Sequence, residues 1–173
     1  DIFQTSLLSP IVSTIRLQTG KEYNTHAQAI RIITDHFIAA TFITASGVVP
    51  SNKEQGYILR RLIRRGLDHL YQLCGSSDSV NVHLRGVHPA TSEVIRSVVE
   101  QYKETDPQLV ERFEHIKGVL LEEEQTYTRT RDQAKRFIQK KYPSTGSGQA
   151  QLGDELMGVT KISADDAFLL YTT

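Results

Sequence analysis

Four arginines stand close together in the segment 60–65, where their side chains could bind an anion. If the segment is helical, each residue advances about 100° around the axis, so Arg61 and Arg64 point most nearly away from the apolar face. Arg60 and Arg65 then lie on the flanks, and all four are expected on the solvent side. Like charges at these spacings repel, and the planar guanidinium matches the oxygens of phosphate. The pattern predicts a phosphate-binding helix face; the alternative is that the arginines pair with acids elsewhere in the fold.

The residues at the expected start of this helix, Ser51 and Asn52, are a second candidate for binding. Exposed N–H groups at a helix N-terminus suit an anion, and an asparagine amide offers both a donor and an acceptor to a base edge. Ser51 and Glu54 also have the spacing of a capping box. The alternative is therefore that this segment only caps the helix.

Other combinations of polar residues carry no catalytic or metal-binding pattern. The six histidines show no HExxH motif or close pair of the ligand type, and the Ser-Gly segment 144–148 lacks the Gly-Lys-Ser/Thr ending of a phosphate loop. The run Glu122-Glu123-Glu124 is expected to be a solvated helix face. We expect no catalytic residue and no metal ligand in this chain.

The elements that would position these residues are helices. Apolar residues recur at three- and four-residue steps, which predicts an all-α fold: a bundle of about five to six helices with one long helix. Thr25 and Asp106 are the expected N-caps of the second and fifth helices, and Gly20, Gly47 and Gly75 are the expected ends of the first three. The expected helices cover residues 6–19, 26–46, 51–74, 89–103 and 107–141, and a short last helix starts at Ser163.

Two of these helices have apolar faces that are expected to form the core. The face of the second helix comprises Ala29, Ile30, Ile33, Phe37, Ala40 and Thr44. The face of the third helix comprises Leu59, Leu62, Ile63, Gly66, Leu67, Leu70 and Leu73.

Composition excludes some classes of protein. The 173 residues contain 20 Lys plus Arg and 20 Asp plus Glu, so the net charge of zero argues against a uniformly basic protein that coats nucleic acid. A single cysteine, Cys74, indicates a reducing compartment, and we expect a cytoplasmic location. The longest uncharged run, 37–52, is shorter than the roughly 18–20 residues of a membrane span. Because the first residue is Asp1 and the one methionine is Met157, we expect a piece of a longer chain.

Three motifs carry a resemblance to a known family. They are R-x-I-x-D-H at residues 31–36, G-x-x-P-S-N at 47–52 and G-Y-x-L-R-R-x-I-R-R at 56–65. In order and spacing the chain closely resembles the alanyl-tRNA synthetase family. Asp1 with the segment 7–11, and A-F-x-L-Y at 167–171, extend the resemblance over almost the whole chain, most loosely at 75–105 and 142–162.

The resemblance implies a part of a class II aminoacyl-tRNA synthetase, which joins alanine to tRNA with ATP and magnesium. Residues 1–173 then correspond to the helical middle domain, which binds the tRNA acceptor stem and its guanine–uracil wobble pair. The catalytic domain would precede it and an editing domain would follow, so this chain alone is expected to be inactive and to hold no cofactor. We expect neither DNA nor a membrane as a partner.

The resemblance also implies roles for single residues. Asn52 corresponds to the asparagine that contacts the wobble pair from the minor-groove side, and the four arginines correspond to a helix beside the acceptor stem. The family has an aspartate after A-F-x-L-Y, where this chain has Thr172, so the uracil side of recognition is expected to differ. The expected tRNA-binding residues are Ser51, Asn52, Arg60, Arg61, Arg64, Arg65 and Thr172.

The arginine-rich helix also allows a function of another class. The same four arginines, in a chain of zero net charge, would suit a helical interaction module that docks the acidic surface of a partner protein. Competition between an acidic protein and RNA distinguishes the two hypotheses.

Overall fold

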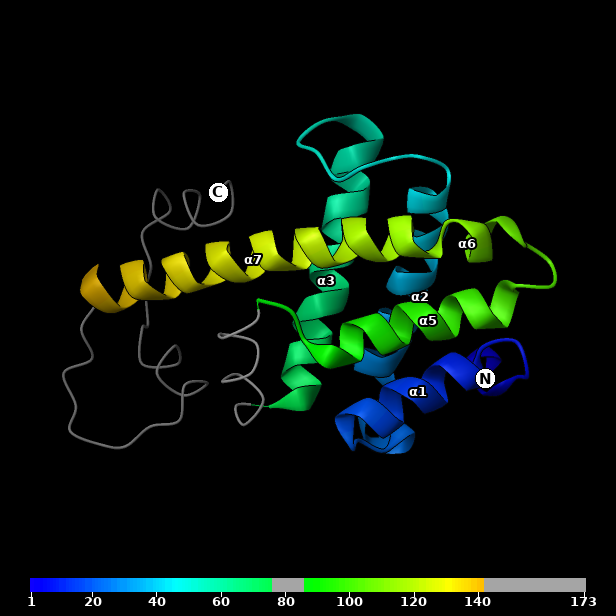
Figure 1. Cartoon of the computed structure of the whole chain (residues 1–173). Helices are drawn as coiled ribbons and strands as arrows, with labels where there is room; N and C mark the ends of the chain where they lie inside the picture. Colours follow the sequence, from blue (N-terminus) through cyan, green and yellow to red (C-terminus); the bar gives the residue numbers. More distant parts are fainter. Residues whose placement is uncertain (76–85, 142–173) are drawn as a thin grey trace. The chain divides into compact units, whose positions relative to one another are not determined.

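The computed structural model describes residues 1–75 and 86–141, and in these residues it contains helices and no β-strand (Figure 1). This confirms the predicted all-α fold with one long helix. The elements are η1 (Ile2–Gln4), α1 (Ser9–Thr19), α2 (Tyr23–Ala45), α3 (Glu54–Cys74), α5 (Pro89–Tyr102), α6 (Gln108–Glu111) and α7 (Phe113–Lys141). The helix expected from Ser163 and most of the loop expected at 75–88 lie outside the described residues.

The chain divides into two compact units, Asp1–Thr126 and Tyr127–Thr173, and the boundary falls inside α7. Among the described residues, the first unit contains η1, α1, α2, α3, α5, α6 and the first half of α7. The described part of the second unit is the remaining half of α7. All the interactions described below belong to the first unit.

In the first unit, α2 and α3 pack along each other, and α1, α5 and the first half of α7 cross them (Figure 1). The predicted apolar faces of α2 and α3 meet in the core, where Phe37 and Leu67 are almost completely buried. A Cβ atom at Gly66 would lie 3.0 Å from the ring of Phe37. Glycine at this position therefore allows the two helix backbones to approach closely.

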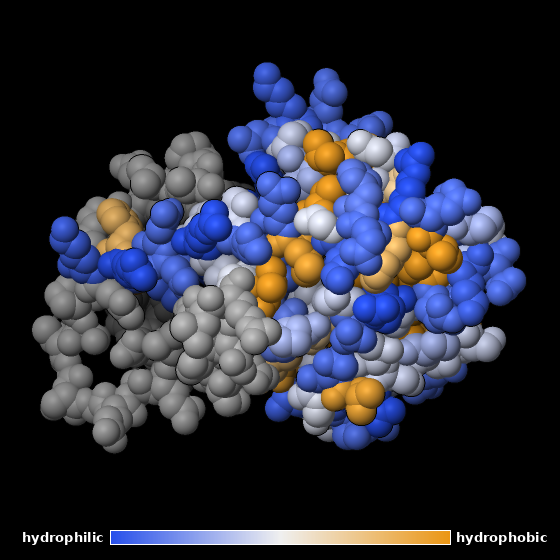
Figure 2. Space-filling view, viewed as in Figure 1, coloured by the Kyte–Doolittle hydropathy of each residue, from blue (hydrophilic) through white to orange (hydrophobic). Residues whose placement is uncertain are grey.

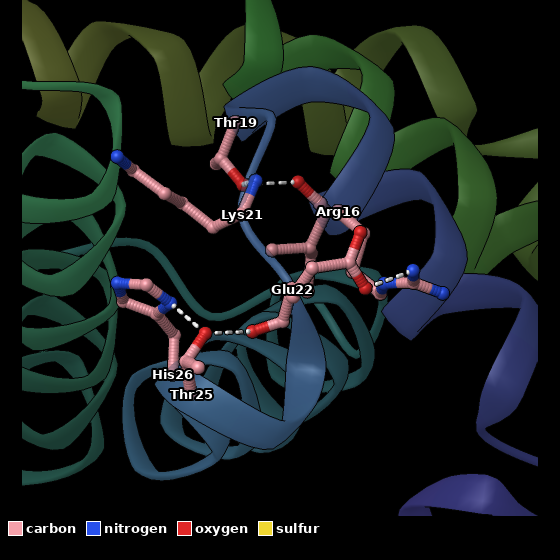
Figure 3. Close-up of polar contacts among 7 residues, drawn as sticks. Arg16, Thr19, Lys21, Glu22, Thr25 and His26 are labelled. Atoms are coloured by element: carbon pink, nitrogen blue, oxygen red, sulfur yellow. Dashed lines mark hydrogen bonds and ion pairs between the residues drawn. The ribbon is translucent and has the colours of Figure 1, made fainter.

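The corner between α1 and α2 differs in detail from the sequence prediction (Figure 3). α1 ends as expected at Gly20, which has a φ of 65°. α2 begins at Tyr23 rather than at His26, and the Thr25 hydroxyl donates to the carbonyl of Glu22 at 3.1 Å instead of capping the helix. His26 has non-helical angles (φ −128°, ψ 25°), which marks a kink after this extra turn.

The predicted fifth helix is broken near its start. α6 begins at Gln108 after Pro107, and the Asp106 carboxylate accepts from the side chain of Gln108 at 3.3 Å rather than capping the backbone. Arg112 (φ −100°, ψ 9°) then separates α6 from α7. Its Nη1 donates to the carbonyl of Ala45 at 2.5 Å, so the break places a cation at the C-terminal end of α2.

Candidate nucleic-acid interface

The segment before α3 folds back on the first turn of the helix. The backbone N–H of Ser51 donates to the carbonyl of Gly56 at 3.1 Å. A Cβ atom at Gly56 would lie 2.6 Å from the carbonyl oxygen of Val49, and closer still to the Ser51 hydroxyl. Only glycine fits here without displacing the segment, which explains the glycine of the G-Y-x-L-R-R motif.

The predicted capping box at the start of α3 is wrong. The Ser51 hydroxyl accepts from the N–H of Lys53 at 3.2 Å and donates to the Lys53 carbonyl at 2.9 Å, while Lys53 itself stands at the N-cap position. Glu54 has a φ of 49°, which a non-glycine residue rarely adopts. The tight turn therefore engages Ser51 locally and starts α3 two residues later than the capping box requires.

Asn52 is exposed at this turn and is held by a residue two helical turns further along α3. The Nη1 of Arg60 donates to its side-chain oxygen, Oδ1. The Nε of Arg60 lies 3.4 Å from Oε1 of Glu123, on α7. The structure therefore brings two of the predicted site residues together, with an acid that the prediction did not include.

Arg64 belongs to the same group of contacts. Its Nε donates to Oε1 of Glu123 at 2.8 Å, and the exposed fractions of the Arg60, Arg64 and Glu123 side chains are 23%, 22% and 5%. The prediction that Arg64 is among the most solvent-facing arginines is wrong, because α7 covers this flank of α3. For Arg60 and Arg64, the alternative of pairing with an acid elsewhere in the fold is confirmed.

Arg61 and Arg65 lie on the exposed face of α3, as predicted for the arginine cluster. Neither forms an ion pair or hydrogen bond with the residues that the structure describes. Tyr57, with an exposed fraction of 43%, continues the same face one turn earlier. These three residues, at steps of four, form an exposed stripe with two cationic groups and one aromatic ring.

His36 of α2 is close enough to this stripe to respond to its charge. Burial lowers the pKa of His36, the carboxylate of Asp35 opposes that shift, and Arg65 and His69 add to it. The imidazole is therefore neutral at pH 7 and adds no positive charge beside Arg65.

The acidic run of α7 is not the solvated face that was expected, since only Glu122 of its three residues is exposed. Glu124 is completely buried, and its Oε1 accepts from Tyr71 Oη at 2.6 Å, the His88 N–H at 2.8 Å and Thr91 Oγ1 at 2.9 Å. Burial raises the pKa of Glu124 to about 7, and the three hydrogen bonds limit the rise. Glu124 thus ties α7 to α3 and to the start of α5.

The sequence contains a signal for the buried position of these acids. Glu123 and Glu124 follow Ile116 and Leu120 at helical steps of three and four, and all four lie on the buried side of α7. If the acids are assigned to the same helical stripe as these apolar residues, rather than grouped as a charge run, Glu123 and Glu124 are expected on the buried side of α7.

The surface in Figure 2 shows apolar side chains as separate patches with hydrophilic side chains between them. Within residues 1–75 and 86–141, no group of three or more His, Cys, Asp or Glu could hold a metal ion. No helix in the same residues is long and apolar enough to span a membrane. Thr172, the last predicted site residue, lies outside the described part of the chain.

Comparison with known proteins identifies the family. A family model described as tRNA synthetases class II (A) matches residues 1–173. The chain belongs to the alanyl-tRNA synthetase family. It is 33% identical to the alanine–tRNA ligase of Thermotoga maritima and 30% identical to that of Bacteroides fragilis, each over 174 residues and 99% of this chain.

The match covers a small part of each relative. The chain spans 17% of the Thermotoga maritima ligase and 18% of the Bacteroides fragilis ligase. The family match confirms the resemblance drawn from the three motifs. Because the chain covers only a small part of each relative, its role within a whole enzyme is stated as a proposal.

Proposed function

We propose that this chain is the part of an alanine–tRNA ligase that binds the acceptor stem of tRNA and reads its guanine–uracil wobble pair. One observation carries the proposal. An exposed amide, that of Asn52, is held next to a helix whose Arg61 and Arg65 are exposed and have no partner among the described residues. A polar group that can read a base edge thus lies in the turn that leads into α3, the helix that carries two groups that can bind phosphate.

The form of double-stranded RNA suits this arrangement. The minor groove of A-form RNA is wide and shallow, so a short side chain such as Asn52 can reach base edges and 2′-hydroxyls in it. Arg61 and Arg65, one turn apart, would contact phosphates and so set the position of the stem without reading its sequence. Arg60 and Arg64 support this face through Glu123. Ser51 and Thr172 remain predicted tRNA-binding residues: Ser51 precedes Asn52 in the G-x-x-P-S-N motif, and Thr172 stands where the family has an aspartate.

The chemistry of alanylation belongs to the rest of the enzyme. ATP and magnesium are implied by the family, but the described residues offer no cluster that could hold the metal. We expect this chain alone to bind tRNA without charging it. We place it in the cytoplasm, in line with its single cysteine.

Binding to two acceptor-stem hairpins that differ only at the wobble pair tests the proposal. The wild-type chain is expected to prefer the guanine–uracil hairpin over the guanine–cytosine hairpin. Asn52→Ala should abolish this preference, and Gln55→Ala, at an exposed neighbouring position, should retain it. Equal binding of both hairpins by the wild type would contradict the proposal. Tighter binding of polyglutamate than of either hairpin at the same salt would favour the acidic-partner hypothesis.

A further inference from the structure

We infer that Arg60 is a positioning residue, which fixes the amide of Asn52 so that its NH₂ group is presented to the RNA as a donor. The role in RNA reading rests on the proposed function above. The fixed orientation of the amide rests only on the contacts that join Asn52, Arg60 and Glu123.

The orientation follows from the chemistry of the two side chains. A guanidinium has N–H donors and no acceptor, so the atom of Asn52 that faces Arg60 must be the oxygen. The Nη1 of Arg60 donates to that oxygen, and the nitrogen of the amide therefore points elsewhere. Asn52 is exposed, so this nitrogen is available to a ligand.

Arg60 can hold this orientation because it is itself anchored. Its Nε forms an ion pair, without a hydrogen bond, at 3.4 Å from Oε1 of Glu123, an acid with an exposed fraction of 5%. Arg64 donates to the same oxygen at 2.8 Å, which fixes Glu123 from a second side. A continuous set of polar contacts thus runs from the buried side of α7 through Arg60 to the exposed amide.

A fixed amide presents its NH₂ group to one kind of partner. Both NH₂ hydrogens of Asn52 can bond to acceptors, such as pyrimidine O2, purine N3 or a ribose 2′-oxygen, while one of the two lone pairs on its oxygen already accepts from Arg60. The exocyclic amino group of guanine is a donor and does not match this NH₂ group. We therefore infer that Asn52 donates to a hydrogen-bond acceptor on a base or ribose of the tRNA stem. Arg60 ensures that the amide presents its NH₂ group, rather than its oxygen, to the RNA.

Two substitutions separate this role from simple phosphate binding. Arg60→Ala should release the amide and reduce the preference for the wobble hairpin from about tenfold to about twofold or less. Arg61→Ala is the matched control: it should weaken binding to both hairpins and keep the preference. Adding Asn52→Ala to Arg60→Ala should cause little further loss of preference, because both changes remove the same contact.

Asn52→Asp keeps the test decisive if Arg60→Ala impairs folding. Aspartate at this exposed position can still accept from Arg60 but has no hydrogen to donate. It should therefore lose the preference as completely as Asn52→Ala does. Preference for the wobble hairpin retained by Asn52→Asp would overturn the inference. Inosine lacks the exocyclic amino group of guanine; if replacing guanine by inosine removed the effect of Asn52→Ala, Asn52 would be reading that donor, and the inference would also be overturned.

The order of the Asn52 amide in the RNA-free chain gives a readout that does not depend on RNA. The ¹⁵N heteronuclear NOE of its side-chain nitrogen should indicate an ordered group in the wild type and in Arg61→Ala, and a mobile one in Arg60→Ala. An amide that stays ordered in Arg60→Ala overturns the inference even if the hairpin preference confirms the proposed function. If the amide is ordered only when Arg60 is present, but the chain binds both hairpins equally, the proposed function is rejected and the positioning of the amide by Arg60 stands.

Discussion

The two pairs of arginines on α3 are neighbours in sequence and differ in their surroundings. Arg60 and Arg64 face α7, where both lie within 3.4 Å of the same carboxylate oxygen of Glu123. Arg61 and Arg65, each one residue further along, are exposed and have no partner among the described residues. A step of one residue on a helix separates a cation that supports the fold from one that is available to a ligand.

The comparison shows that the number of arginines in a segment does not tell how many of them are available to a ligand. Four arginines within six residues appear equivalent in sequence, but burial beside an acid commits one pair to the structure of the site. The exposed pair keeps its full hydrogen-bonding capacity for phosphate.

Removing the shared acid should have the largest effect. Glu123→Ala would remove the buried carboxylate that Arg60 and Arg64 share, and we expect the free energy of unfolding to fall by about 3 kcal/mol. Urea unfolding followed by circular dichroism measures this change. Glu122→Ala, at the exposed neighbouring position, should change it by less than about 0.5 kcal/mol. Equal effects of the two substitutions would remove the distinction between the two arginine pairs.

The second buried acid of α7 predicts a pH dependence. The pKa of Glu124 is raised from 4.5 to about 7, so the folded state binds this proton more tightly than the unfolded state. Its contribution to stability is complete below pH 4.5, decreases as the pH rises and is lost above about pH 7. The loss should be on the order of 2 kcal/mol, and at most about 3.4 kcal/mol, since each pKa unit between 4.5 and 7 corresponds to about 1.36 kcal/mol.

Glu124→Gln tests this pH dependence directly, because glutamine keeps the shape and does not titrate. The difference in unfolding free energy between the wild type and this variant should change between pH 5 and pH 7.5, with the variant gaining on the wild type as the pH rises. Glu122→Gln serves as the exposed control and should follow the wild type throughout. A constant difference for Glu124→Gln would show that its carboxyl group does not titrate in this range.

The turn that carries Asn52 should be sensitive to a single methyl group. Gly56→Ala would place its Cβ 2.6 Å from the Val49 carbonyl oxygen, and we expect a loss of about 1–2 kcal/mol together with a loss of wobble preference. Gly118→Ala on α7, where nothing lies within 4 Å of the new Cβ, should be neutral or stabilising by up to about 1 kcal/mol. Unchanged hairpin preference in Gly56→Ala would mean that the turn does not position Asn52.

Much of the fold could be predicted because apolar periodicity records which helix faces are buried. The stripe of α2 that contains Ile33 and Phe37, and the face of α3 that contains Leu59 and Ile63, are buried as expected. Glycine also marked the end of α1, since the φ of Gly20 is one that other residues rarely adopt. These signals are local, so the sequence carries them without reference to the rest of the chain.

The errors arose where a distant residue decides the outcome. The solvent-facing position expected for Arg64 depended on what covers that flank of α3, and Glu123 lies 59 residues away in sequence. The break at Arg112 places its guanidinium on the carbonyl of Ala45, 67 residues earlier. Helical periodicity contains no information on such pairings, whereas the motif resemblance predicts a site at the start of α3 without them.

The salt dependence of RNA binding tests the central claim most directly, because it counts the cations that contact phosphate. For the wobble hairpin, the slope of log K against log salt should become less steep by about 2 in the Arg61→Ala/Arg65→Ala double variant, roughly one for each arginine. The stability of that variant should stay within about 0.5 kcal/mol of the wild type. An unchanged slope, with binding still intact, would contradict the assignment of the exposed arginines to the RNA backbone.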